Sequence, residues 1–219
     1  MIVVIGSTAL RGIGPEARPD GLVADIARAA IDEGAHVELV GKVGNDPAGD
    51  ALVVALARAG IGHVATLRDP SRPTVVRMAD PTGVGGLDPA PAEAVDETAV
   101  AAPAPVLEPA DVALALRYVT DFGVVLTVHV APEVLAEAVA AAAWAEAHLV
   151  VVVEPDSAVP DGVAPDTLVI ELADAGGAGP SDVAGAGALL GRYAAAVDRG
   201  DDRSAAYAAM TAAAAAGSA

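Results

Sequence analysis

The stretch Val37-Glu38-Leu39-Val40-Gly41-Lys42-Val43-Gly44-Asn45-Asp46-Pro47-Ala48-Gly49-Asp50 indicates most clearly how the chain folds. Its first residues form an apolar run that predicts a buried strand over Val37–Val40. Asp46 then precedes Pro47, a pair typical of a helix start, because a carboxylate can cap free N–H groups and proline fits the first helical position. The stretch therefore predicts a strand that leads into a helix over Pro47–Ala59.

Short apolar runs and longer alanine-rich segments alternate in the same way along all 219 residues. The short runs predict strands at Ile2–Ile5, Val37–Val40, Val75–Met78, Val112–Leu116, Val124–Val130, Leu149–Val153 and Leu168–Leu172. The longer segments predict helices at Gly21–Glu33, Pro47–Ala59, Pro132–Ala147, Asp182–Asp198 and Arg203–Ala216. Strands that are apolar on both faces and alternate with helices predict a single α/β domain over residues 1–219. Its sheet is expected to be mostly parallel, with helices on both faces.

Two passages interrupt this alternation. Residues 80–110 are rich in proline and glycine, and they predict a loop or a small excursion. Residues 173–187 form a glycine-rich passage that we expect directly before a helix. Small residues at a helix start, as in Ser181–Gly187, would leave backbone N–H groups facing an anion. A tight loop that packs the helix closely against a strand is the alternative, and the residues alone leave both open.

The charge and composition of the chain limit its partners. Thirty Asp and Glu against 12 Lys and Arg give a net charge of −18, which opposes binding to nucleic acid or to an anionic membrane surface. No uninterrupted apolar run is long enough for a transmembrane helix, and the first residues resemble a buried strand and not a secretory signal. The absence of cysteine excludes disulfides and thiolate metal sites, and it favours a cytoplasmic location.

The histidines give no sign of a metal site. His36, His63, His129 and His148 show neither the i,i+4 spacing nor the clustering with carboxylates that metal binding needs. We therefore expect structural or solvated roles for all four.

Several motifs, taken in order, resemble the ribokinase/PfkB family of carbohydrate and nucleoside kinases. The stretch quoted first is similar to the family's V-G-x-V-G-x-D-x-x-G. It is followed, in the family's order, by Arg72-Pro73-Thr74, Asp80-Pro81-Thr82-Gly83, Pro109-Ala110-Asp111-Val112 and Asp182–Ala188, the last similar to D-T-x-G-A-G-D. The resemblance implies a ribokinase-like three-layer sandwich with a reduced lid near residues 64–110. It also implies that Pro109–Val112 enters a central strand.

The resemblance assigns a phosphate site and a catalytic base, and the base departs from the family pattern. Gly185, Ala186 and Gly187 take the place of the anion hole that binds phosphate. The family's base falls on Ala188, or on Gly187 in another register, so the carboxylate is missing. Loss of a general base typically lowers turnover by roughly 10²–10⁴-fold.

Substrate, metal and nucleotide contacts are implied in the same way. Substrate contacts fall on Gly21, Asp25, Gly41, Lys42 and Asn45, with Asp25 standing where the family has asparagine. Asp174 and Asp182 are the acids left for Mg²⁺. ATP and Mg²⁺ would be the cofactors of an active enzyme, although the nucleotide-side segment is truncated between about residues 174 and 181.

Two functions are compatible with these departures. One is a catalytically impaired pseudokinase that binds a small phosphorylated or sugar-like ligand, or a protein partner. The alternative is an active ATP-dependent sugar or nucleoside kinase in which Asp182 or Asp25 replaces the missing base. In either case the lid strands near residues 64–78 would allow a homodimer.

Overall fold

A six-stranded parallel sheet forms the centre of the molecule. The computed structural model describes residues 1–78, 103–157, 163–172 and 180–217. The strand order is β5-β4-β1-β7-β8-β9, and every neighbouring pair is parallel. The strands are β1 (Ile2–Gly6), β4 (Val37–Gly44), β5 (Thr66–Asp69), β7 (Val124–Val128), β8 (His148–Val153) and β9 (Leu168–Glu171). The predicted α/β class is confirmed.

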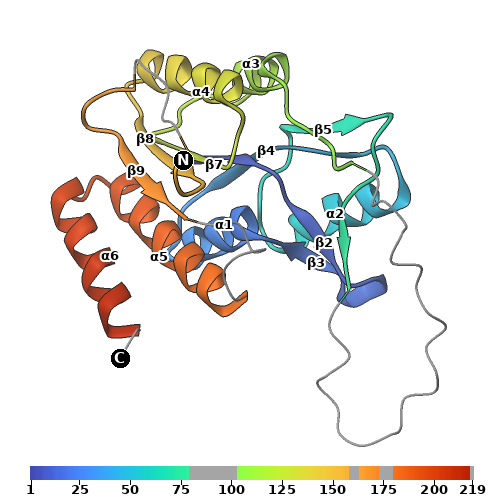
Figure 1. Cartoon of the computed structure of the whole chain (residues 1–219), viewed down its shortest axis with the longest axis horizontal. Helices are drawn as coiled ribbons and strands as arrows, with labels where there is room; N and C mark the ends of the chain where they lie inside the picture. Colours follow the sequence, from blue (N-terminus) through green and yellow to red (C-terminus); the bar gives the residue numbers. More distant parts are fainter. Residues whose placement is uncertain (79–102, 158–162, 173–179, 218–219) are drawn as a thin grey trace, which may run out of the picture.

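Helices cover both faces of this sheet, which gives the three layers seen in Figure 1. One layer holds α1 (Leu22–Asp32), α2 (Pro47–Arg58), α5 (Pro180–Asp198) and, outside α5, α6 (Arg203–Gly217). The other layer holds α3 (Pro109–Tyr118) and α4 (Pro132–Trp144). Ile2 and Val4 of β1 pack with the first layer, and Val3 and Ile5 pack with the second. Burial on both faces explains why the strands are apolar throughout.

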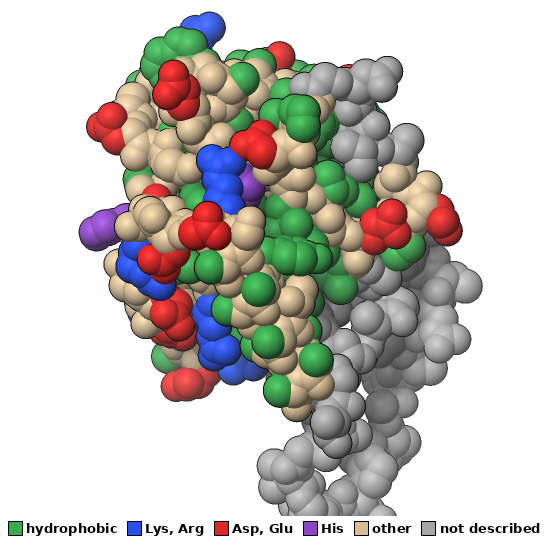
Figure 2. Space-filling model, turned by 90° about the vertical axis from the view of Figure 1, so that its left-hand side faces the viewer, with side chains coloured by type: hydrophobic (Ala, Val, Ile, Leu, Met, Phe, Trp, Pro, Cys, Tyr) green, Lys and Arg blue, Asp and Glu red, His purple; other side chains and the backbone are tan. Residues whose placement is uncertain are grey.

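The outermost helix, α6, carries no negative charge, although the chain as a whole has a net charge of −18. It packs on α5 through Ala206 and Met210, and it contains no acidic residue. Figure 2 looks onto this side of the molecule and shows hydrophobic side chains along the helix. Among the described helices, including α6, we find none with the length and apolar character of a membrane span.

A second, smaller sheet lies beside the central one (Figure 1). It contains β2 (Ala9–Arg11), β3 (Arg18–Asp20) and β6 (Val76–Arg77) in the order β3-β2-β6, and the short helix η1 (Gly14–Glu16) joins β2 to β3. The lid was expected near residues 64–110. Within that range, β5 joins the central sheet and β6 joins the smaller one. Residues 79–102 of that region lie outside the described part of the chain.

The segment Val112–Leu116 is helical, so the predicted strand there was wrong. It lies in α3, which begins at Pro109. The Asp111 carboxylate accepts a hydrogen bond from the Glu108 N–H at 2.9 Å, an arrangement that stabilises a helix start. Val112 and Ala115 are the buried residues of α3, a spacing that suits a helix and not a strand.

The end of β4, the start of α2 and the segment before β6 meet at the Asp46 carboxylate. It accepts hydrogen bonds from the Gly49 N–H at 2.7 Å, the Thr74 N–H at 2.8 Å and the Thr74 hydroxyl at 2.7 Å. The Thr74 hydroxyl in turn accepts from the Gly44 N–H at 2.9 Å. Burial raises the pKa of Asp46, but these hydrogen bonds, led by that from the Thr74 backbone, outweigh burial and hold the pKa below its usual range.

Glycine is required at two positions around this carboxylate. A Cβ on Gly44 would lie 2.5 Å from the Thr74 nitrogen, and a Cβ on Gly49 would lie 2.2 Å from the Gly44 oxygen. Two of the three glycines in the stretch that indicates the fold are therefore explained by close backbone packing.

We expect Asp46→Asn to lower the free energy of unfolding by about 1.5–3 kcal/mol, because it removes charge-assisted hydrogen bonds from a partly buried site. Asp50→Asn is the matched control on the same helix, since its side chain is 77% exposed. That substitution should change the free energy by less than about 1 kcal/mol. Denaturant unfolding followed by circular dichroism measures both, and equal effects would contradict the role of Asp46.

The low pKa of Asp46 also predicts a pH dependence. A carboxyl whose folded pKa is depressed stabilises the fold above its unfolded pKa of about 4, and this contribution is lost as the pH falls through the folded pKa. The stability difference between wild type and Asp46→Asn should therefore shrink as the pH is lowered from about 5 to about 2. A difference that stays constant over this range would exclude a titrating Asp46.

Candidate functional site

A cavity of about 270 Å³ opens at the carboxyl ends of β1 and β7. Strands β4 and β5 lie on one side of β1, whereas β7, β8 and β9 lie on the other, so the strand order reverses between β1 and β7. Ligands of open parallel sheets bind in the crevice at such a reversal. The cavity is lined by Ser7, Thr8, Ala9, Asp20, Gly21, Leu22, Val23, Val75, Arg77, Ala104, Val128 and His129.

Asp20, the last residue of β3, is the charged centre of the cavity wall. It is 8% exposed, and its carboxylate accepts from Arg11 at 2.6 and 3.1 Å and from Arg77 at 3.2 Å. Burial raises the pKa of Asp20, but the hydrogen bonds from Arg11 and then Arg77 outweigh burial and hold the pKa below its usual range. Among the described residues, two arginines contact this single carboxylate, in a chain whose net charge is −18.

The start of α1 forms another part of the wall. Gly21 precedes the helix with φ 100°, a value that glycine adopts without strain. Within the described part of the chain no side chain caps this helix, so its first N–H groups have no side-chain partner there. A Cβ on Gly21 would lie 3.6 Å from Arg77 Nη1, and the Thr8 hydroxyl donates to the Asp20 carbonyl at 3.0 Å. The end of β1, the helix start and the arginine therefore meet at the cavity.

His129 forms the wall at the end of β7. Its Nε2 donates to the Leu172 carbonyl at 2.8 Å, and its Nδ1 lies 3.6 Å from Glu154 Oε1. Its backbone N–H donates to the Val152 carbonyl at 3.0 Å. The sequence analysis gave this histidine only a structural or solvated role, whereas the structure places it at the cavity.

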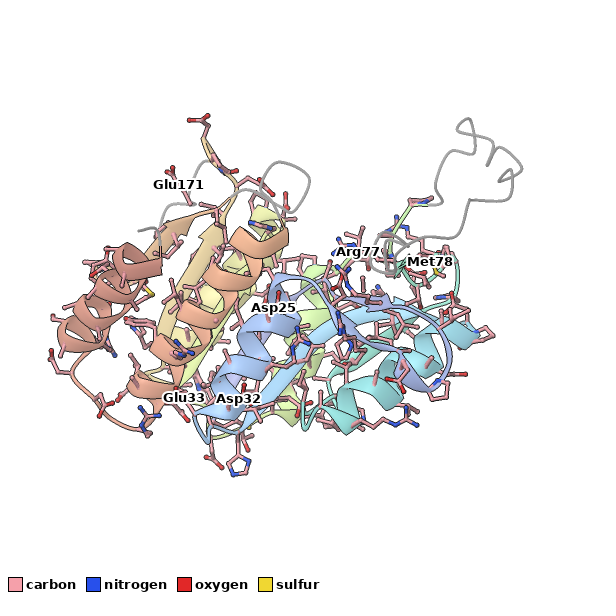
Figure 3. The ribbon with its side chains drawn as sticks, turned by 90° about the horizontal axis from the view of Figure 1, so that it is seen from below. Asp25, Asp32, Glu33, Arg77, Met78 and Glu171 are labelled. Atoms are coloured by element: carbon pink, nitrogen blue, oxygen red, sulfur yellow. The ribbon has the colours of Figure 1, made fainter. Side chains whose placement is uncertain are left out.

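Two of the predicted substrate residues lie at or near the cavity. Gly21 lines it, and Asp25 lies one turn further along α1, where it pairs with Arg28. Asp25 also lies against α5 (Figure 3).

The other three predicted substrate residues, Gly41, Lys42 and Asn45, belong to β4 and its end and do not line the cavity. Gly41 is buried in the sheet, and Asn45 is exposed. Lys42 Nζ donates to Asp111 Oδ2 at 2.7 Å, an ion pair that ties β4 to the start of α3.

The predicted phosphate-binding residues lie inside α5. This helix begins at Pro180, so Gly185, Ala186 and Gly187 occupy its second turn and do not precede it. In an α-helix each N–H donates to the carbonyl four residues earlier. The N–H groups of these three residues are therefore directed to the carbonyls of residues 181–183.

Close packing of α5 on α1 accounts for the second glycine of that motif. A Cβ on Gly187 would lie 2.6 Å from the Asp25 Cβ, and one on Gly191 would lie 2.4 Å from the Ile26 carbonyl oxygen. Residues four apart share one face of a helix, so the two glycines let α5 approach the α1 backbone. The contact brings Asp25 beside Gly187, one of the two positions that the family resemblance gives to the base.

The predicted metal ligands are only partly covered by the structure. Asp174 lies outside the described residues, and Asp182 is described only in its helical backbone. Within the described ranges, His, Asp and Glu side chains form no group of three or more that would hold a metal ion.

Three cavity residues, Thr8, Asp20 and Arg77, were missed by the sequence analysis. Asp20 stands directly before the predicted helix start at Gly21, and that position was the available signal. Arg77 carried no local signal, because it reaches the cavity through the pairing of β6 with β2, a contact between distant parts of the chain.

Solved structures of other proteins share this architecture. No family model and no curated protein matches the chain. The apo form of a "putative Ribokinase II" from E. coli aligns with a TM-score of 0.59 at 13% identity, over 94% of this chain and 88% of that chain. The chain has a ribokinase-like fold.

Further matches show how this ribokinase-like chain compares in length. The crystal structure of Sa239 aligns with a TM-score of 0.54 at 18% identity, over 73% of this chain and 56% of that one. An uncharacterized sugar kinase from Pyrococcus horikoshii, PH1459, in complex with ATP, gives 0.49 at 13% identity, over 88% of this chain and 60% of that one. The chain therefore spans less than two thirds of the length of Sa239, and at 18% identity the relationship is remote.

We expect Gly187→Ala to lower the free energy of unfolding by about 1–3 kcal/mol, because its Cβ would overlap Asp25 where α1 and α5 meet. Gly185→Ala is the matched control, since nothing lies within 4 Å of a Cβ at that position. Alanine there should raise stability by roughly 0.5–1 kcal/mol through helix propensity. Denaturant unfolding compares the two, and a stabilised Gly187→Ala would show that the helices do not pack as described.

Proposed function

We propose that this chain is a ribokinase-like pseudokinase that binds a small phosphorylated or sugar-like ligand without transferring phosphate. The observation that carries the proposal is the cavity at the strand-order reversal, with Asp20 and Arg77 in its wall. The position that the family resemblance gives to the base is occupied by Ala188 or Gly187, neither of which can take a proton.

The charges of the cavity favour a ligand with an anionic group. Among the described residues, Asp20 is the partner of the Arg77 side chain, which uses Nη1 for that contact and is 41% exposed. The remaining guanidinium N–H groups suit a phosphate, because arginine binds phosphate oxygens through paired N–H donors. Ionised Asp20 and the Thr8 hydroxyl supply acceptors for ligand hydroxyls.

The size of the cavity favours a monosaccharide over a nucleotide. Pockets for drug-sized ligands occupy about 300–1,000 Å³. The volume of about 270 Å³ is below that range. A sugar phosphate combines the size and the charge that the described wall accepts.

The residues that the family uses for nucleotide phosphate do not fit that group in this conformation. The N–H groups of residues 185–187 are directed to carbonyls within α5, and Gly187 is covered by α1. Neither ATP nor Mg²⁺ therefore enters the proposed function, which is binding alone.

We expect ribose 5-phosphate to bind more tightly than ribose, by about tenfold or more, because only the phosphate forms charge-assisted hydrogen bonds with Arg77. Arg77→Gln should remove most of this difference. Arg58→Gln, which removes a cation that donates to the Pro15 carbonyl outside the cavity, is the control.

Isothermal titration calorimetry with ribose, ribose 5-phosphate, fructose 6-phosphate and Mg-ATP makes these measurements. Equal affinity for ribose and its phosphate would exclude the assigned role of Arg77. If the wild-type protein bound none of the sugars or sugar phosphates, the proposed function would be overturned.

An active kinase is the second candidate, and the position of Asp25 favours it. The Asp25 Cβ lies 2.6 Å from the point that a Gly187 Cβ would occupy. An aspartate therefore lies beside Gly187, one of the two positions that the family resemblance gives to the base, and its carboxylate pairs with Arg28. Asp182, the other substitute suggested by the sequence, is described only in its backbone.

Turnover separates the two candidates. We expect the wild-type protein to release no ADP from Mg-ATP in the presence of pentoses, hexoses or nucleosides, and measured release would favour the kinase. In that case Asp25→Asn or Asp182→Asn should lower turnover by about 10²–10⁴-fold if the substituted residue is the relocated base. Asp32→Asn, at the exposed far end of α1, is the control (Figure 3).

A further inference from the structure

His129 has a strained backbone at the cavity wall. Its φ of 48° is a value that residues other than glycine rarely adopt. The other described non-glycine residues with positive φ, namely Asp121, Glu146 and Asp156, are all exposed. His129 differs because its side chain is only 16% exposed and it lines the cavity. Strain of this kind persists where the surrounding structure enforces it, and it is concentrated at functional sites.

The surrounding contacts fix the imidazole in one orientation. Nε2 donates to the Leu172 carbonyl at the end of β9, and Nδ1 lies 3.6 Å from the Glu154 carboxylate at the end of β8. Neither Leu172 nor Glu154 lines the cavity, so both nitrogens are directed to groups outside it. Rotation of the ring to admit a larger ligand would break the bond to Leu172.

We propose that His129 determines ligand size in this cavity. Contacts at the ends of β8 and β9 hold its ring in the cavity wall. The positive φ of His129 results from placing the ring in this position. The inference rests on the proposed function, because it concerns the ligand of the same cavity. Since both ring nitrogens are directed elsewhere, His129 excludes large ligands by its bulk, and polar recognition is left to Asp20, Arg77 and Thr8.

The test compares two glycine substitutions that relieve the same backbone conformation. His129→Gly removes the ring from the wall, whereas Glu146→Gly acts at an exposed turn outside the cavity lining. The probes are ribose 5-phosphate and the bulkier N-acetylglucosamine 6-phosphate, which carry the same anionic group. His129→Gly should shift the ratio of their dissociation constants toward the bulkier probe by about tenfold or more. Glu146→Gly should leave the ratio unchanged.

A ratio that His129→Gly leaves unchanged, or an equal shift in Glu146→Gly, would overturn the inference. His129→Asn replaces the glycine variant if that variant does not fold, because asparagine tolerates the same backbone conformation.

Hydrogen exchange of the ligand-free protein separates failure of this inference from failure of the proposed function. Loss of the bond to Leu172 should speed amide exchange at residues 168–172 in His129→Gly and not in Glu146→Gly. Unchanged exchange would show that His129 does not brace the wall, whichever probe binds. If exchange is faster but the wild-type protein binds neither probe, nor ribose nor fructose 6-phosphate, the proposed function is overturned, and the size limit with it.

Discussion

The Asp20 carboxylate, held between two arginines, is the interaction on which the candidate site depends. Arg11 belongs to β2, Arg77 belongs to β6, and Asp20 ends β3 directly before α1. One buried charge therefore joins all three strands of the small sheet and fixes them to a helix that covers the central sheet. A carboxylate buried to this degree is unfavourable without such partners. The three residues act as one unit, and the cavity wall is formed where that unit meets the ends of β1 and β7.

The central sheet could be predicted because its strands carry a strong local signal. Val124–Val128 is buried at every position, and an apolar run of this kind is visible in the sequence alone. The strands of the small sheet have two or three residues each, which is too short for any periodic pattern. Val112–Leu116 was misassigned because alanine alternating with valine and leucine fits both a strand and a helix. The cap at Glu108 and Asp111 decides between them.

The candidate site was less predictable than the fold, and the glycines show why. A glycine in a sequence marks a place where space for a side chain is lacking, but it does not say what occupies that space. Gly187 was predicted to face an anion, and in the structure the neighbour is α1. Gly21, which the family resemblance gave as a substrate contact, does lie at the cavity. Arg77 and His129 reach the same cavity from distant segments, and only the tertiary arrangement brings them together.

The ion pairs that join the strands of the small sheet also have a kinetic consequence. Arg11 and Arg77 hold Asp20 through contacts within the chain, so the fold itself fixes the described walls of the cavity. A preorganised site loses little conformational entropy on binding. Affinity differences among related ligands would then lie mainly in how long each one stays bound, with similar rates of association for all of them.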